Sequence, residues 1–222
     1  MQKRKLAALA GVTLLSAGFL AACGSAASNG DSSAPTTFSY VFTSDPTTLD
    51  YTVRNAAETT DITTNLVDGL LENDKYGNLI PSLAESWTVS ADGLTYTYKL
   101  REGVMWYTSD GEEYAEVTAQ DFVTGLQHAA DSESEALYLV QDSIKGLAAY
   151  LDGSDKDFAN VGVKAVDDYT VEYTLAQAEP YWNSKTTMGI LQPINAEFLE
   201  SKGEDFGSVD PTSILYNGAY FL

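Results

Sequence analysis

Cysteine, histidine and basic residues are all scarce in this 222-residue chain. Its single Cys excludes an internal disulfide and any Cys-rich zinc site. Its single His argues against a His-rich metal site and against a Ser-His-Asp triad. Only 12 Lys and Arg oppose 32 Asp and Glu, for a net charge of −20. Nucleic-acid binding needs clustered basic residues, so we expect no nucleic-acid partner.

Common catalytic and metal-binding motifs are also absent from the sequence. It contains neither Gly-x-Ser-x-Gly nor His-Glu-x-x-His, which argues against the common hydrolases. The acidic stretch 152–157 lacks the oxygen-ligand pattern of an EF-hand calcium loop. We therefore expect no catalytic residues, no metal and no cofactor. The apolar content of 44% is nevertheless enough to build a core.

The N-terminus has the pattern of an export signal. Three basic residues within 1–5 precede an uncharged stretch, 6–22. A cleaved signal, an uncleaved membrane anchor and a lipoprotein signal all fit that pattern. Seventeen uncharged residues are at the short end for a span. Leu20-Ala21-Ala22-Cys23-Gly24 resembles a bacterial lipobox, and it holds the only Cys. We predict a lipoprotein signal peptide over 1–22 with lipidation at Cys23.

A tether and an acidic body follow the predicted lipidation site. Residues 23–36 are rich in Ser, Ala and Gly, which predicts a flexible tether. Loss of residues 1–22 would leave 9 basic against 32 acidic residues, a net charge of −23. Anionic lipid head groups would repel such a body, so the anchor has to be covalent. These features predict a location on the extracellular face of the cell membrane.

Hydrophobic periodicity predicts a mixture of strands and helices in the body. Alternation indicates strands over 37–42, 87–89 and 94–100, with a tight turn at Asp92-Gly93. Two further alternating runs, 161–166 and 170–175, predict a hairpin. Helical spacing predicts helices over 56–71 and 133–151, and shorter ones over 180–188 and 195–201. Another helix is predicted to begin at Thr118, because Thr118 and Asp121 have the spacing of a capping box. A turn and strand are expected at 217–220, and the chain ends within an apolar run, which predicts truncation.

The body resembles the family 5 solute-binding proteins, the extracytoplasmic receptors of ABC importers, and within them the Gram-positive oligopeptide-binding lipoproteins. Each matching stretch is weak alone, but their order over roughly 36–222 is specific. Two departures are an Ala at position 219, where many members have Pro, and a longer loop over 107–116. The matching stretches are Leu49-Asp50, Gly69-Leu70-Leu71, residues 79–87, 92–101, 103–106, Asp110-Gly111, 117–122, 163–168 and 216–220.

The resemblance implies a fold and a domain organisation. The fold class would be α/β (mixed α+β), periplasmic-binding-protein-like type II. The chain would correspond to the N-terminal lobe only, with an inserted subdomain. Residues 37–80 and 170–222 would form an incomplete domain I, and residues 81–169 would form domain II.

The resemblance also implies where a peptide would bind. The family holds peptides as extended strands through their main-chain hydrogen bonds, so side-chain identity matters little. The matching strand falls at Arg54, Asn55, Ala56 and Ala57, where small side chains let another backbone approach. A plain loop leading into a helix is the alternative. Tyr138 could stack on or hydrogen-bond to the peptide, although a purely structural Tyr is the alternative there.

The resemblance implies a lipid-anchored receptor that captures oligopeptides and passes them to ABC permease subunits, without enzymatic activity. Two alternatives remain open. One is a receptor of the same fold for a dipeptide, nickel chelate or haem, and the other is a surface lipoprotein hydrolase or adhesin. We expect 222 residues to be too few to enclose a ligand, so that this chain alone binds peptides weakly or not at all.

Overall fold

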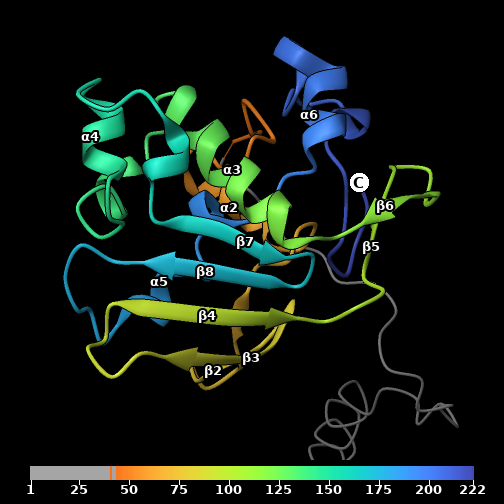
Figure 1. Cartoon of the computed structure of the whole chain (residues 1–222). Helices are drawn as coiled ribbons and strands as arrows, with labels where there is room; N and C mark the ends of the chain where they lie inside the picture. Colours follow the sequence, from red (N-terminus) through yellow and green to blue (C-terminus); the bar gives the residue numbers. More distant parts are fainter. Residues whose placement is uncertain (1–40, 42–43) are drawn as a thin grey trace, which may run out of the picture. The chain divides into compact units, whose positions relative to one another are not determined.

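A computed structural model describes residue 41 and residues 44–222 (Figure 1). The leader, Cys23, the tether and all but one residue of the strand predicted over 37–42 lie outside the described residues. The described part is a mixed α/β structure. Its helices are α2 (Ala57–Thr63), α3 (Ala119–Asp131), α4 (Leu147–Leu151), α5 (Trp182–Lys185) and α6 (Ala196–Lys202). Its strands are β1 (Leu71–Asn73), β2 (Leu79–Pro81), β3 (Ala84–Val89), β4 (Thr95–Leu100), β5 (Met105–Tyr107), β6 (Glu113–Glu116), β7 (Val163–Asp167) and β8 (Thr170–Thr174).

A four-stranded antiparallel sheet in the order β3-β4-β8-β7 forms the centre of this part of the chain. The strand predicted over 94–100 and the hairpin predicted over 161–175 are confirmed as β4 and the β7–β8 pair. Gly93 has a φ of 72° in the turn before β4, as the Asp-Gly pair predicts. β4 alternates as expected, because Tyr96 and Tyr98 are buried whereas Lys99 is exposed.

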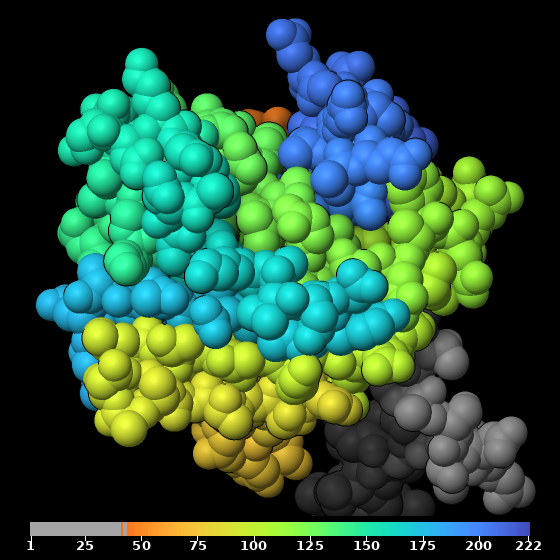
Figure 2. Space-filling model, in the orientation of Figure 1, coloured from red at the N-terminus to blue at the C-terminus, as the bar shows by residue number. Residues whose placement is uncertain are grey.

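The sheet buries one face and leaves the other open to solvent, which is common in antiparallel sheets. On the buried face, Tyr173 lies 5.3 Å from Trp182 between ring centroids, and Tyr98 donates a hydrogen bond to the side chain of Asn183. These contacts fix α5 against the sheet, and α3 packs on β7 and β8. Figure 2 shows β4, β7 and β8 uncovered on the opposite face.

Two short hairpins, β1–β2 and β5–β6, complete the strand pairing in the described residues. The second hairpin is joined to the end of the chain by a bridge between Tyr107 and Tyr216. Residues 217–220 form a bend after this bridge and no strand, so the expected strand there is wrong. The main-chain N–H groups of Asn217 and Gly218 instead donate to the carbonyl of Leu66.

Helix α3 begins as its sequence predicts. Thr118 and Asp121 form a reciprocal capping box, which satisfies main-chain N–H groups that the first turn leaves without partners. The buried residues Phe122, Leu126 and Ala130 recur at helical spacing. The two shorter helices expected near residues 180–188 and 195–201 appear as α5 and α6.

The helix predicted over 56–71 is wrong beyond residue 63. Helix α2 ends at Thr63, and Leu71 already belongs to β1, opposite Pro81. The carbonyl of Leu70 accepts main-chain hydrogen bonds from Ser82 and Ala84, so the local backbone is committed to strand-like pairing. The apolar residues at helical spacing are buried by tertiary contacts instead.

The single helix predicted over 133–151 is also wrong. Only a 3-10 turn, Leu137–Leu139, and α4 form within it. Glu133 has a φ of 52° and Gly146 a φ of 78°, and both values interrupt a right-handed helix. The apolar spacing predicted which residues are buried, including Val140, Ile144 and Leu147, but not the backbone between them.

Candidate functional site

Residues 54–57, which we call the edge segment, lead into the start of α2. Ala56 has φ −127° and ψ 144°, the geometry of a strand, and Ala57 is the first helical residue. A turn precedes the segment, and the Asp50 carboxylate fixes that turn. Its Oδ1 accepts from the N–H of Thr52 at 3.1 Å and from the N–H of Val53 at 3.1 Å.

The segment that follows α3 lies directly against the edge segment. The Arg54 Nη1 is 2.5 Å from the Glu135 Oε1, and the Asn55 N–H donates to the Glu135 Oε2 at 3.2 Å. The Asn55 side-chain amide donates to the Tyr138 hydroxyl at 3.3 Å. The structure therefore brings Arg54, Asn55 and Tyr138 together. Ala56 and Ala57 follow Asn55 in the chain, and neither makes a hydrogen bond to Tyr138 within the described residues.

Several main-chain groups of the edge segment have no partner among the described residues. They are the carbonyl oxygens of Arg54 and Asn55 and the N–H of Ala56. Asn55 and Ala57 are exposed, and the Tyr138 side chain next to them is 64% exposed. An extended segment with free donors and acceptors can pair with another extended chain.

The charges around the edge segment form a loose, solvent-screened group. Arg54 lies between Glu135 and Glu58, whose Oε1 is 3.9 Å from its Nη2. The Arg54 side chain is 36% exposed and that of Glu135 50% exposed. A pair this exposed contributes about 0–1 kcal/mol to stability. Its effect is to orient the Glu135 carboxylate toward the Asn55 N–H.

Sequence reasoning missed Glu135 and the role of Asp50. Glu135 lies beyond the end of α3, about 80 residues from its partner, so no local pattern marks it. Asp50 belongs to a stretch that carries the family resemblance, and that was its only signal. The Asp50 carboxylate also contacts the one His of the sequence, because the His128 Nε2 lies 2.8 Å from the Asp50 Oδ2.

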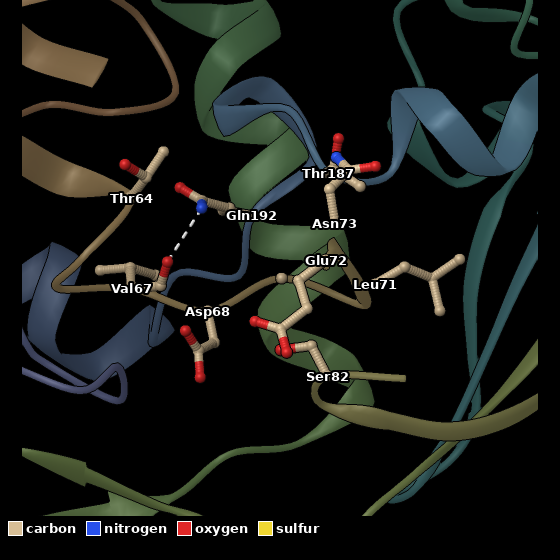
Figure 3. Close-up of a pocket in the computed structure, with 10 residues that line it drawn as sticks. Thr64, Val67, Asp68, Leu71, Glu72, Asn73, Ser82, Thr187 and Gln192 are labelled. Carbon is tan, nitrogen blue, oxygen red and sulfur yellow. Dashed lines mark hydrogen bonds between the residues drawn. The ribbon is translucent and has the colours of Figure 1, made fainter. Parts of the chain in front are cut away.

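A separate polar hollow of about 270 Å³ lies between α2, β1 and the segment that follows α5 (Figure 3). The carboxylates of Asp68 and Glu72 line it with Thr187 and Gln192, and the Gln192 side-chain amide donates to the Val67 carbonyl at 2.9 Å. Burial raises the pKa of Asp68, and the negative charge of Glu72 adds to that rise. None of these polar side chains was predicted as a site residue.

Within residue 41 and residues 44–222, no group of three or more His, Cys, Asp or Glu side chains is arranged to hold a metal ion. No helix in the same residues is long and apolar enough to cross a bilayer.

Comparison with known families identifies the chain. Residues 78–222 match the model of the bacterial extracellular solute-binding proteins, family 5 Middle. The chain belongs to the family 5 solute-binding proteins. The resemblance read from the sequence motifs is confirmed by this match.

Streptococcal relatives in the family match the chain from end to end. It is 62% identical to the oligopeptide-binding protein SarA of Streptococcus gordonii, covering 100% of this chain and 34% of the relative. It is 61% identical to the oligopeptide-binding protein AmiA of Streptococcus pneumoniae, again over 100% of this chain and 34% of the relative. The chain thus spans about a third of the length of these relatives.

Solved structures of the family share the fold. The Listeria monocytogenes OppA bound to peptide matches with a TM-score of 0.70 and 32% identity, over 77% of this chain and 33% of that one. The oligopeptide ABC transporter substrate-binding domain of Bacillus anthracis matches with a TM-score of 0.72 and 34% identity, over 79% and 33%. These likenesses agree with the mixed α/β architecture.

Proposed function

We propose that this chain is part of a receptor that captures extracellular oligopeptides and delivers them to an ABC permease without altering them. The observation that carries the proposal is the edge segment, with free main-chain groups beside the exposed Tyr138. Relatives described as oligopeptide-binding proteins, more than 60% identical over the whole chain, support the same cargo.

The proposed mechanism is the addition of a strand. The carbonyl oxygen of Arg54 accepts a hydrogen bond from a peptide N–H, and the Ala56 N–H, which lies on the same strand edge, donates to a peptide carbonyl. Because these contacts use only the peptide main chain, many sequences can bind. The Tyr138 ring adds a face for stacking or a hydroxyl for hydrogen bonding.

In this proposal the chain supplies the N-terminal lobe of a type II binding protein. Residues 37–80 and 170–222 contribute to domain I, and residues 81–169 form the inserted domain II. A diacylglycerol on Cys23 anchors the protein at the extracellular face of the membrane, and residues 23–36 act as the tether. The family membership of the body and the lipobox around Cys23 support this arrangement.

Peptide titration of the whole chain, followed by NMR, tests the proposal. The probe is the neutral pentapeptide Ser-Ala-Gly-Ala-Ser, and the control is the same peptide N-methylated at every peptide bond, which removes the donors from both edges of the extended chain. About two main-chain hydrogen bonds, near 1 kcal/mol each, predict a Kd on the order of 10 mM or weaker. We expect shift changes at residues 54–57 and 138 with the unmethylated peptide only.

The same titration separates the alternatives. Equal binding of the methylated peptide would contradict strand addition, and cleavage of the pentapeptide would contradict a receptor role. Binding of Ala-Ala but not of the pentapeptide would favour a dipeptide receptor. Nanomolar binding of the pentapeptide would overturn the expectation that this chain alone binds weakly.

A further inference from the structure

The turn before the edge segment is held by one buried carboxylate that three parts of the chain surround. Asp50 is only 8% exposed. Its Oδ1 accepts from the Thr52 N–H, the Thr52 hydroxyl and the Val53 N–H. The Arg54 N–H donates to the Asp50 carbonyl at 3.1 Å, so the main chain of the turn closes on the same residue.

The other carboxylate oxygen of Asp50 is in hydrogen-bond contact with His128. The His128 Nε2 lies 2.8 Å from the Asp50 Oδ2, and the imidazole is carried by α3, a helix fixed against the sheet. The Phe206 ring meets the imidazole edge-on at 5.3 Å between centroids. A Cβ on Gly207 would lie 2.5 Å from the Asp50 Cβ, so the chain at 207 packs directly on the main chain and Cβ of Asp50.

The end of α3 fastens the turn a second time. The Ser134 hydroxyl donates to the Thr52 carbonyl at 2.6 Å, and the Glu135 N–H donates to the Val53 carbonyl at 3.0 Å. Helix α3 and the segment that follows it therefore hold the turn before the edge segment at separate points. His128 acts through Asp50, and the residues just past the helix act directly on the main chain.

The arrangement around His128 does not fit nucleophilic catalysis. The Ser132 Oγ is 3.5 Å from the His128 Nδ1, so Ser132, His128 and Asp50 follow the order of a triad. A nucleophile and its base normally lie about 2.6–3.2 Å apart, and Ser132 is also the residue that caps the C-terminus of α3. The shorter contact of His128 is the one to Asp50, whose carboxylate also bonds the turn before the edge segment.

We propose that His128 is a positioning residue for peptide capture, which acts through Asp50 to hold residues 52–55 in the geometry that presents their main-chain groups. The inference rests on the proposed function. It adds a half-buried residue, distant in the sequence, that determines how the edge segment is presented, although His128 itself touches no peptide.

Amide hydrogen exchange of the whole chain tests this role without any peptide. His128→Leu removes the donor to Asp50, whereas His128→Gln keeps a side-chain N–H near the position of Nε2. We expect exchange at residues 52–55 to be at least about 10-fold faster in the Leu variant and within about 3-fold of the wild type in the Gln variant. The amides of Tyr96 and Tyr98 in β4 serve as the internal control and should not change.

The His128→Leu variant leaves the Asp50 carboxylate without its His partner and could unfold. A milder variant keeps the test valid in that case. Thr52→Val removes only the hydroxyl bond to Asp50 and should speed exchange at Val53 by about 3-fold. Unchanged exchange at 52–55 in His128→Leu would overturn the proposal. Equal acceleration in β4 would also overturn it, because the role would then be global stability.

The pentapeptide titration of the same variants separates this inference from the proposed function. If the wild type binds, we expect binding about 5-fold weaker in His128→Leu and restored in His128→Gln. A wild type that does not respond to the peptide contradicts the proposed function. A binding wild type whose Leu variant keeps slow exchange at 52–55 contradicts the role of His128 alone.

Discussion

Asp121 shows at the scale of a single residue how one carboxylate can serve two neighbours. It accepts from the Trp106 indole N–H at 2.8 Å and from the Thr118 N–H at 3.1 Å, and it is 4% exposed. Burial raises the pKa of Asp121 to about 6, although these hydrogen bonds act in the opposite direction. The folded state therefore binds this proton more tightly than the unfolded state does.

The raised pKa of Asp121 predicts a pH dependence of stability. Between pH 4 and pH 6 the folded state holds more protons at this site, so its contribution to stability falls as pH rises. We expect this group to make the protein about 1 kcal/mol more stable at pH 5 than at pH 7. Urea denaturation at both pH values, compared between wild type and Asp121→Asn, measures the difference. An identical pH dependence in the variant would contradict the prediction.

The sequence predicted half of the Asp121 environment. The Thr118-x-x-Asp121 spacing indicated the capping box, because both partners lie within one turn. The Trp106 contact comes from β5 and depends on tertiary packing, which no local spacing records. In the candidate site, the family pattern indicated Arg54, Asn55 and Tyr138, and their role in peptide binding stays a prediction. Glu135, which contacts Arg54 and Asn55, could not be predicted, because only the fold brings it there.

At the scale of elements, Gly146 separates α4 from the segment after α3. Its φ is 78°, and a Cβ at this position would lie 2.6 Å from the Asn160 carbonyl oxygen. The apolar spacing over 133–151 predicted one helix because it indicates which residues are buried. Here the buried residues are spread over several short turns instead of one helix. A positive φ has no signature in hydrophobic periodicity, and Gly146 itself was the only available sign.

Gly146 and Gly153 form a matched pair for testing this break. Gly153 has a φ of 77° and nothing within 4 Å of an added Cβ. Gly153→Ala should therefore cost only the backbone strain, about 1 kcal/mol. Gly146→Ala adds the clash with Asn160 and should cost about 2–4 kcal/mol. Urea denaturation measures both, and equal losses would show that the close approach to Asn160 is unimportant.

At the scale of the whole molecule, the net negative charge and the proposed lipid anchor act in opposite directions at a membrane surface. The chain after residue 22 would carry a net charge of −23, which anionic lipids repel. Attachment at the membrane surface therefore depends on the proposed lipid at Cys23. Salt should not release a chain held in this way, because no attractive ion pairs would be screened.

Cys23→Ser tests the anchor. Expressed in a Gram-positive host, the wild type should incorporate labelled fatty acid and stay with the membrane fraction through a wash at about 1 M salt. The Ser variant should lose both properties, and Ser25→Ala, a change in the same stretch, should keep both. Retention of the Ser variant in the membrane fraction would contradict a lipid anchor at Cys23.

Strand β4 has one neighbour close by in the chain and one far away. β3 lies just across a tight turn, whereas Lys99 pairs with Thr170, 71 residues later. During synthesis or translocation the two early strands can form a ribbon at once, but the second side of β4 stays open until β8 has emerged. The side chains of Tyr96 and Tyr98 remain exposed to solvent during that interval. A chaperone that binds the nascent polypeptide could therefore contact the exposed tyrosine side chains of the β3–β4 ribbon before β8 covers β4.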